Sequence, residues 1–574
     1  MPQALHGIGV SSGIAIGKVR ILHHGQVDLP EYAITPDQVD HEIARFRSAL
    51  AQAKAQLREL RQRIPQGTPA DIAAFIDTHL LMLEDTPLSR EPEEIIRSHL
   101  CNAEWALKLQ QDALVQVFEA MDDPYLRTRC DDVEHVVRRV VHLLLNKSAS
   151  EHEGDAEEPH IVLAADISPS DLVQLHQQHI AALVTERGGP LSHTAILARS
   201  LGIPAIVGVP RVHQYLREDE MVVVDGRQGA LLVGLDAQGL EFYRKRQRAE
   251  LKARHELRKL KDTPSVTLDG VTIHLQANIE LYEDISAMRK VGAAGVGLYR
   301  TEFLFMNRTT PPDEEEQYQV YRQTVKRMNG APLTIRTLDL GADKELFPGQ
   351  ANSRNPALGL RAIRLCLKEP ELFKPQLRAI LRASAHGPVK LLIPMLTTVS
   401  ELRPVRQILD EVRHELAAEN LRFDPNLPIG GMIEVPAAAL CANYFARELD
   451  FLSIGTNDLI QYTLATDRID ETVNHLYDPL NIAVLRLIRD TIRAGASAGI
   501  PVSLCGEMAS DPALTRLLLG MGLTDFSMPP AALLQVKHIV ITTTLEPLRA
   551  HVEKLLQSHR PEEIAEGLAQ LNRL

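Results

Sequence analysis

Hydrophobic and polar positions change their spacing along the chain, and each change predicts a different kind of structure. Short apolar runs broken by glycine occupy residues 1–27, which is typical of strands. Between Thr35 and about Asn146 the apolar residues recur with a helical period, which predicts four or five capped helices packed as a bundle. From Ile161 onward, strand-like apolar runs alternate with helical segments.

These patterns divide the first half of the chain into regions. We expect the early strands to pair with later ones, because they have too little partner material of their own, so that residues 1–27 and 147–234 form one α/β domain. The helical bundle, residues 28–146, would then be inserted in that domain. The highly charged residues 235–263 predict a solvent-exposed linker helix.

Residues 264–574 repeat a strand followed by a helix, which predicts a (β/α)8 TIM barrel as the last domain of an α/β multidomain protein. A doubly wound sheet would also alternate, but the count of eight strands favours the barrel. The active site of such a barrel lies at the strand ends and in the loops after them. The candidate strands are VTIHLQANI, AGVGLYR, LTIRTLDLG, VKLLIPML, PIGGMIEV, FLSIGT, PVSLCGE and TDFSMP.

One histidine stands where a loop becomes a helix, in the stretch GGPLSHTAILARSLGIPAIVG at residues 188–208. Ser192 suits the cap before that helix, and Gly202 suits its end. The positive end of a helix favours a neutral imidazole and stabilises an anion on the ring, so His193 is a candidate nucleophile for a phosphoryl group. Taken alone, the motif fits a solvent-facing cap residue without chemistry better than a nucleophile.

Polar side chains gather at the predicted strand ends of the barrel. Several arginines there imply an anion with several oxygens, because a guanidinium binds phosphate or carboxylate through two hydrogen bonds. Two carboxylates from neighbouring strands suit Mg²⁺, and a thiol can protonate an enolate. Each group alone also fits an ion pair, a loop anchor or, for the thiol, a small buried side chain. The set comprises Arg300, Thr301, Glu302, Arg336, Asp339, Asp343, Lys344, Asn355, Arg361, Arg364, Glu434, Asn457, Asp458, Arg468, Cys505 and Glu507.

Composition narrows the class of protein. The net charge of −13 argues against nucleic acid or an anionic membrane as the main partner and suits a partner with a basic face. No apolar run approaches the roughly eighteen residues of a membrane span, and residues 1–30 lack the pattern of a secretion signal, so we expect a cytoplasmic protein without membrane insertion. The five cysteines, without C-x-x-C spacing, indicate neither a disulfide framework nor a zinc site.

Several long motifs, in the same order, resemble the enzyme I family of the bacterial phosphotransferase system, the phosphoenolpyruvate–protein phosphotransferases. The resemblance runs from GIGVSSGIAIG to DFSMP and includes GGPLSHTAILARSLGIPAIVG, GVGLYRTEFLFM, TIRTLDLGADKEL, NPALGLRAIR, GMIEVPAA, SIGTNDLIQYTLATDR and LCGEMASDP. It implies that phosphoenolpyruvate (PEP) phosphorylates a histidine on a swivelling domain, which passes the group to the phosphocarrier protein HPr. Pyruvate is released in this first step of sugar uptake. The resemblance also implies a homodimer formed through the barrel domain.

The family roles fall on matching positions of this sequence. The resemblance implies that His193 is phosphorylated and that Cys505 protonates the enolate. Glu434 and Asp458 would hold Mg²⁺. The residues that would hold PEP are Arg300, Arg336, Asn457, Asp458 and Arg468, with Arg361 as a further phosphate ligand. The residues that would dock HPr, with bundle packing as the alternative for each, are Phe75, His79, Leu83, Glu84 and Asp85.

Some local features depart from the family pattern. Pro190 and Leu191 precede Ser-His, where small or polar residues are frequent, and Leu172 lies where a hydroxyl partner for the active histidine is expected. Ser168 or Ser170 would be the substitutes. Two alternative functions stay open: a nitrogen-regulatory branch of the family, and a PEP sensor that docks partners without turnover. The intact set of motif residues argues against the sensor.

Overall fold

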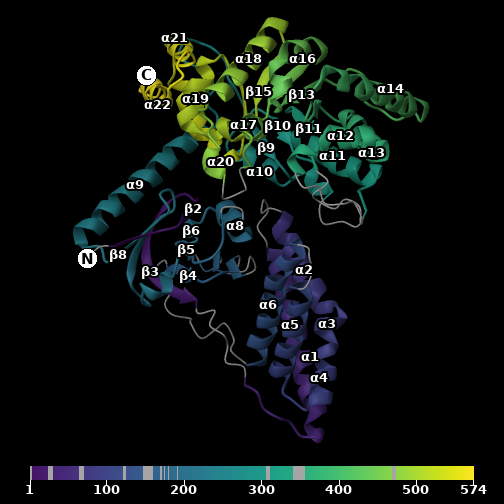
Figure 1. Cartoon of the computed structure of the whole chain (residues 1–574), viewed down its shortest axis with the longest axis vertical. Coiled ribbons are helices and arrows are strands. Elements are labelled where there is room, and N and C mark those ends of the chain that lie inside the picture. The colour runs from purple at the N-terminus through teal and green to yellow at the C-terminus, as the bar shows by residue number, and fades with distance from the viewer. Residues whose placement is uncertain are drawn as a thin grey trace. The chain divides into compact units, whose positions relative to one another are not determined.

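The chain folds into two compact units, Met1–Ala253 and Arg254–Leu574, in a computed structural model (Figure 1). No helix among the described residues is long and apolar enough to cross a membrane. The structure describes residues 3–22, 30–63, 70–119, 124–145, 160–167, 171–172, 175–176, 178, 180–189, 192–305, 310–340, 356–467 and 473–573.

The first unit contains an eight-stranded sheet drawn from two separate parts of the chain. Its order is β1-β8-β7-β3-β4-β5-β6-β2, so strands from both parts are interleaved. β3, β4, β5 and β6 run parallel to one another, and the other neighbours are antiparallel. The strands are β1 (Gln3–His6), β2 (Ile8–Ser11), β3 (Ile14–Leu22), β4 (His160–Ala164), β5 (Ala182–Thr185), β6 (Ala205–Val207), β7 (Met221–Asp225) and β8 (Ala230–Val233).

A helical bundle is inserted between β3 and β4. One buried apolar cluster joins bundle residues such as Phe46 and Val137 to Val162 of the sheet and to Leu197 of α8 (His193–Leu201). The bundle therefore shares its core with one face of the sheet. Beyond the predicted helices, the described residues include the four-residue α3, which is too short to show a period. The helices are α1 (Val39–Arg63), α2 (Ala70–Glu84), α3 (Thr86–Ser89), α4 (Glu91–His99), α5 (Ala103–Glu119) and α6 (Pro124–Leu144).

A charged helix, α9 (Ala237–Lys259), occupies the stretch where the sequence predicted one, and none of its residues is buried. The boundary between the two units falls inside it. Its early part is held to the first unit by polar contacts: Arg246 pairs with the buried Asp225 at 3.2 Å, and Gln247 donates to the carbonyl of Ile14 at 2.8 Å.

The second unit is a closed barrel of eight strands, in the order β9 to β16, which confirms the barrel predicted from the sequence (Figure 1). Every neighbouring pair is parallel. The carboxyl ends of all eight strands therefore meet at one rim. The strands are β9 (His274–Ile279), β10 (Val296–Tyr299), β11 (Leu333–Arg336), β12 (Val389–Ile393), β13 (Ile429–Ile433), β14 (Phe451–Ile454), β15 (Val502–Leu504) and β16 (Asp525–Met528).

Helices surround the barrel and supply most of its core. A small separate cluster of Leu298, Leu392, Met432, Phe451 and Cys505 lies apart from the larger core shared by strands and helices. The helices are α10 (Asp284–Lys290), α11 (Glu314–Met328), α12 (Ala362–Lys368), α13 (Pro370–Ser384), α14 (Leu402–Ala418), α15 (Pro436–Leu440), α16 (Ala442–Glu448), α17 (Thr456–Leu464), α18 (Ile482–Ala498), α19 (Pro512–Gly520), α20 (Pro530–Ile541), α21 (Leu545–Leu555) and α22 (Pro561–Leu571).

Candidate active site

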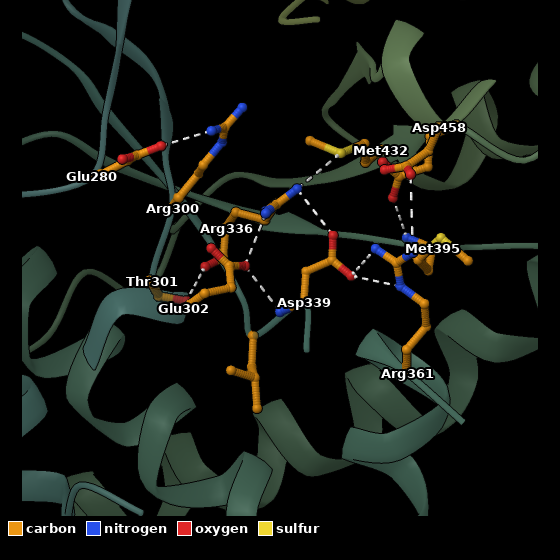
Figure 2. A network of polar contacts seen from close by, with 12 residues as sticks. Glu280, Arg300, Thr301, Glu302, Arg336, Asp339, Arg361, Met395, Met432 and Asp458 are labelled. Atoms are coloured by element: carbon orange, nitrogen blue, oxygen red, sulfur yellow. Dashed lines mark hydrogen bonds and ion pairs between the residues drawn. The ribbon is translucent and has the colours of Figure 1, made fainter. Parts of the chain in front are cut away.

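The predicted polar residues of the barrel follow successive strands at its carboxyl rim. Arg300 follows β10, Arg336 ends β11, Glu434 follows β13, Asp458 lies in the first turn of α17 after β14, and Cys505 follows β15. Because the strands are parallel and closed, residues distant in sequence meet at one mouth. Figure 2 shows the central part of this meeting as a connected network of polar contacts.

Arg336 is the buried centre of this network. Its guanidinium donates to Glu302 at 2.9 Å and pairs with Asp339 at 3.1 Å (Figure 2). The backbone N–H of Asp339 donates to the same Glu302 oxygen at 3.0 Å, so the two acids are tied to each other as well. Burial alone would lower the pKa of Arg336, but the carboxylates of Glu302 and Asp339 outweigh it and hold that pKa above its ordinary value. Arg336 is therefore a fixed positive charge.

Asp339 connects Arg336 to a second arginine. Arg361, at the start of α12, donates to Asp339 through Nη2 at 2.9 Å and through Nε at 3.2 Å. Its Nη1 atom lies 3.9 Å from Asp458. Burial acts to raise the pKa of Asp339, yet the two arginines lower it, so the carboxylate stays ionised. The mouth thus carries two oriented guanidinium groups held by one carboxylate.

Three carboxylates form a candidate metal site. Asp339, Glu434 and Asp458 each offer an oxygen, and these atoms lie within 4.8 Å of one another. Hard oxygen donors suit Mg²⁺, which is bound by one or two carboxylates together with substrate phosphate and water. A Cβ at Gly455 would lie 2.7 Å from an oxygen of Glu434, so only glycine leaves room for that carboxylate. These donors fit a hard divalent cation.

The surroundings of Glu434 show what a cation would change. Its side chain is buried, and one oxygen accepts a hydrogen bond from the backbone N–H of Met395 at 2.6 Å. Burial, followed by repulsion from Asp458 and Asp339, raises the pKa of Glu434 well above its ordinary value. A cation among the three carboxylates would reverse that shift, because it attracts the ionised form.

Arg300 stands at the same rim with a partner that sequence reasoning missed. Its Nη1 donates to Glu280, at the end of β9, at 2.7 Å (Figure 2). Both side chains are about 37% exposed, so the pair is accessible to water and the guanidinium can exchange partners. Glu280 could have been suspected from its place directly after the first barrel strand.

Cys505, directly after β15, is a buried thiol. The hydroxyl of Ser453 donates to its sulfur at 3.4 Å, and the amide of Asn278 donates to its carbonyl at 3.0 Å. Burial raises the pKa of the thiol, while the Ser453 hydroxyl acts in the opposite direction. The group is therefore held as a neutral S–H, which is the form that can give up a proton.

Asn457 is fixed against the loop that carries Cys505. Its side chain accepts from the backbone N–H of Glu507 at 2.8 Å and donates to the Glu507 carboxylate at 3.3 Å. Gly506 allows this close approach, because a Cβ there would lie 1.9 Å from the hydroxyl oxygen of Thr456. The structure therefore links the start of α17 to the end of β15.

In the first unit, α8 begins at His193, as the sequence predicted. The hydroxyl of Ser192 accepts from the N–H of Ala195 at 3.2 Å and caps the helix. Thr194 donates to the carbonyl of Ile167 at 2.9 Å, which fixes the helix start against the end of β4. The start of a helix is electrostatically suited to an anion. The side chain of His193 lies outside the described part of the structure.

The prediction that His79 and Leu83 of the bundle contact a partner requires a correction. His79 and Leu83 are each only 1% exposed, and His79 lies 3.7 Å from Asp132 and against the ring of His135, so both residues pack inside the bundle. One helical turn separates them, which places them on the same inward face. They are not available as surface contacts for a partner. Glu84 and Asp85 are exposed, as expected.

Several predicted positions lie outside the described residues. Leu172, by contrast, is described and fully buried, so it packs in the core and offers no hydroxyl to His193. The sequence places Asp339 at a strand end without indicating its role, although its position three residues after Arg336 is a signal. The predicted positions outside the described part are Ser168, Ser170, Pro190, Leu191, Asp343, Lys344, Asn355, Arg468 and the side chain of Phe75.

Sequence profiles of one known protein family match most of the chain. The sequence profile described as "PEP-utilising enzyme, PEP-binding domain" matches residues 254–545. The profiles described as "N-terminal" and "mobile domain" of PEP-utilising enzymes match residues 6–129 and 156–229. The three matched regions follow one another along the chain and together cover most of it.

Full-length relatives carry one name. A phosphoenolpyruvate-protein phosphotransferase of Cupriavidus necator is 47% identical and covers 100% of both chains, and one of Staphylococcus carnosus is 38% identical over 99% of this chain and 98% of its own. A solution structure of Enzyme I, 31% identical, covers 43% of this chain and 99% of its own with a TM-score of 0.37. With such sequence identity along its whole length, the chain belongs to the PEP-utilising enzyme family and, within it, to the phosphoenolpyruvate–protein phosphotransferases.

Proposed function

We propose that this chain transfers the phosphoryl group of PEP to its own His193 and then to the histidine of an HPr-type phosphocarrier, releasing pyruvate, as the first step of a sugar phosphotransferase system. The observation that carries the proposal is the convergence of fixed arginines and three carboxylates at the carboxyl rim of the barrel. That mouth binds a small, highly charged anion, and PEP carries both a phosphate and a carboxylate.

The arginines bind and orient PEP. Arg336 cannot turn away, because Glu302 and Asp339 hold it, and Arg361 is held by Asp339. Arg300 is exposed enough to leave Glu280 for the substrate. Fixed donors cost little reorganisation during the reaction and stabilise charge on the transferred group. We assign Asn457 and Arg468 to the same binding site through their places in the family motif.

Glu434 and Asp458, joined by Asp339, would hold Mg²⁺ in this proposal. When bound, the cation supplies neutralising charge for the phosphate of PEP. Other residues of the chain prepare the carboxylates. Arg336 and Arg361 keep Asp339 ionised, and Gly455 leaves room for the carboxylate of Glu434. Asp339 therefore carries its negative charge before substrate arrives, and the site has room for the carboxylate of Glu434.

Transfer forms a bond between phosphorus and a ring nitrogen of His193 and breaks the bond between phosphorus and the enol oxygen. The electron pair of the broken bond stays on that oxygen, and the enolate must gain a proton at its methylene carbon to become pyruvate. Cys505 is the proton donor in this proposal. Its buried, protonated thiol supports the assignment.

Delivery to the carrier requires His193 to leave the barrel mouth. We propose that its domain swivels about α9, which has no buried residue and contains the boundary between the two units. The exposed acids Glu84 and Asp85 on the bundle would attract the basic face of the carrier. The family resemblance also supports a homodimer formed through the barrel domain.

A two-part assay tests the proposal. The full-length protein is incubated with PEP and Mg²⁺, and pyruvate is measured in a single turnover; HPr is then added to protein phosphorylated beforehand. Cys505→Ala should slow pyruvate formation far more than transfer from the phosphorylated protein to HPr, because only the first step needs the proton. Equal slowing of both steps would remove Cys505 from its role, and absence of transfer to HPr would overturn the proposed carrier.

A further inference from the structure

Tyr462 lies one helical turn after Asp458 on α17, and so on the same face of that helix. Its hydroxyl donates to the backbone carbonyl of Ala357 and accepts a hydrogen bond from Nη1 of Arg361 at 3.2 Å. The phenol therefore connects α17, which carries a candidate metal ligand, to the segment that leads into α12.

The contacts of Arg361 are divided among three groups. Its Nε and Nη2 atoms donate to one oxygen of Asp339, at 3.2 and 2.9 Å, as Figure 2 shows. Its remaining nitrogen, Nη1, donates to Tyr462 and lies 3.9 Å from Asp458, too far for a hydrogen bond. The phenol thus takes the nitrogen of Arg361 that faces the Asp458 carboxylate.

The alternative contact would be strong. An arginine side chain that is largely buried loses free energy when one of its N–H groups has no acceptor. Without the hydroxyl, a small rotation would bring Nη1 onto Asp458 and form a charge-assisted hydrogen bond. That bond would neutralise a carboxylate that the proposed function needs for a divalent cation.

We propose that Tyr462 is a positioning residue that holds Arg361 toward Asp339 and away from Asp458, so that Asp458 stays available to the cation. The inference rests on the proposed function, because it assumes that Asp458 is a metal ligand. Burial raises the pKa of Tyr462 to about 12, so the phenol keeps its proton and donates to Ala357 while accepting from Arg361.

Direct binding of Mn²⁺ to the full-length protein, measured without PEP from the electron paramagnetic resonance signal of free Mn²⁺, tests this role. Tyr462→Phe removes only the hydroxyl and should raise the Mn²⁺ dissociation constant about tenfold. Tyr318→Phe is the matched control, because it removes a phenol hydroxyl that bonds His386 at 3.0 Å on the outside of the same barrel. The control should bind Mn²⁺ as the unmodified protein does.

A double-mutant cycle separates positioning from a general loosening of the site. In an Arg361→Met background no guanidinium competes for Asp458, so adding Tyr462→Phe should leave the Mn²⁺ dissociation constant unchanged. A tenfold loss that persists in this background would overturn the inference, as would unchanged Mn²⁺ binding by Tyr462→Phe alone. If the unmodified protein bound no Mn²⁺, the metal assignment of the proposed function would itself fail, a result distinct from the other two.

Discussion

The mouth of the barrel and the α2 region of the bundle were both predicted as functional sites, but the fold treats their residues differently. At the barrel mouth, residues from stretches far apart in the sequence converge, because parallel strands end at one rim. In the bundle, neighbours in one stretch diverge: Leu83 is buried, while Glu84 beside it is exposed. Neighbourhood in sequence therefore says less about a shared site than the topology does.

The ion pairs of the barrel mouth and of the bundle also differ in how exposed they are to water. The Arg336–Asp339 pair in the barrel has side chains only 11% and 3% exposed, whereas Arg58 and Glu84 in the bundle form a pair 60% and 47% exposed. Buried charges depend on each other, since neither partner can turn to water. Exposed charges are screened and exchange partners freely, which suits a surface for transient docking.

The largest expected effect comes from breaking the buried network. Arg336→Met leaves Glu302 and Asp339 without their shared partner and should destabilise the barrel by about 3–5 kcal/mol. PEP-dependent phosphorylation should fall by about a hundredfold or more, because a fixed donor to the phosphate is lost. Denaturant unfolding of the full-length protein and a single-turnover pyruvate assay measure the two effects.

The matched change in the bundle is Arg58→Met. It breaks an exposed pair and should cost less than about 1 kcal/mol, with phosphorylation by PEP unchanged. If both substitutions destabilised the protein equally, the contrast between the two regions would be wrong.

The burial of Leu83 predicts a large effect on stability in the bundle. Leu83→Ala should cost about 2–5 kcal/mol of free energy of unfolding, because it leaves a cavity among packed helices. Leu81→Ala on the same helix should cost little, because Leu81 is 66% exposed. Thermal unfolding of the full-length protein, followed at the transition of the first unit, distinguishes the two substitutions. A neutral Leu83→Ala that weakened carrier binding would return Leu83 to the docking surface.

Metal removal tests the carboxylates of the barrel mouth. Mg²⁺ at about a hundred times its dissociation constant should stabilise the unmodified protein by about 2.7 kcal/mol, and Glu434→Gln should lose most of that gain. Melting curves with and without Mg²⁺, or with a chelator, measure it. Equal stabilisation of both proteins would exclude Glu434 as a ligand.

The metal-free protein should also show the raised pKa of Glu434 in its stability. Burial, Asp458 and Asp339 raise that pKa in the folded state, so folding takes up a proton. The contribution is fully present below the ordinary carboxyl pKa and is lost as the pH rises through the raised value. Glu434→Gln should therefore stabilise the metal-free protein at pH 8 and have little effect at pH 4.

The smallest effect is expected at the exposed acids of the bundle. Glu84→Gln combined with Asp85→Asn should weaken carrier binding about two- to fivefold at low salt and less at high salt. Asparagine preserves the cap that Asp85 provides by accepting from the N–H of Thr86 at 2.8 Å, and loss of the exposed Arg58–Glu84 pair should cost less than about 1 kcal/mol. Titration of the carrier at two ionic strengths checks this. If the affinity for the carrier changed with neither the substitutions nor the ionic strength, the docking surface would have to lie elsewhere on the protein.

The sequence predicted the parts of this protein that depend on local pattern. Eight apolar runs with turns between them sufficed for the barrel, and the Ser-His step with a later glycine sufficed for α8 (His193–Leu201). Residues that end predicted strands, such as Arg336 and Glu434, could be assigned to one rim because the fold class itself places strand ends together.

The rest depends on which side chains meet, and a linear pattern does not contain that information. Asp339 joins two arginines only because Arg361, at the start of α12, comes within reach of the end of β11. Tyr462 reaches Arg361 from another strand–helix unit. The inward direction of His79 follows from the rotation of α2 (Ala70–Glu84) against α6 (Pro124–Leu144), which depends on packing rather than on the apolar or polar class of the residue.

Above all, we propose that the barrel mouth phosphorylates His193 from PEP. The most direct measurement is mass spectrometry of the full-length protein after incubation with PEP and Mg²⁺, with peptide mapping under alkaline conditions. We expect one acid-labile phosphoryl group on the peptide containing His193, absent from His193→Ala and strongly reduced in Arg336→Met. A phosphoryl group that persists in His193→Ala, or none on the unmodified protein, would contradict it.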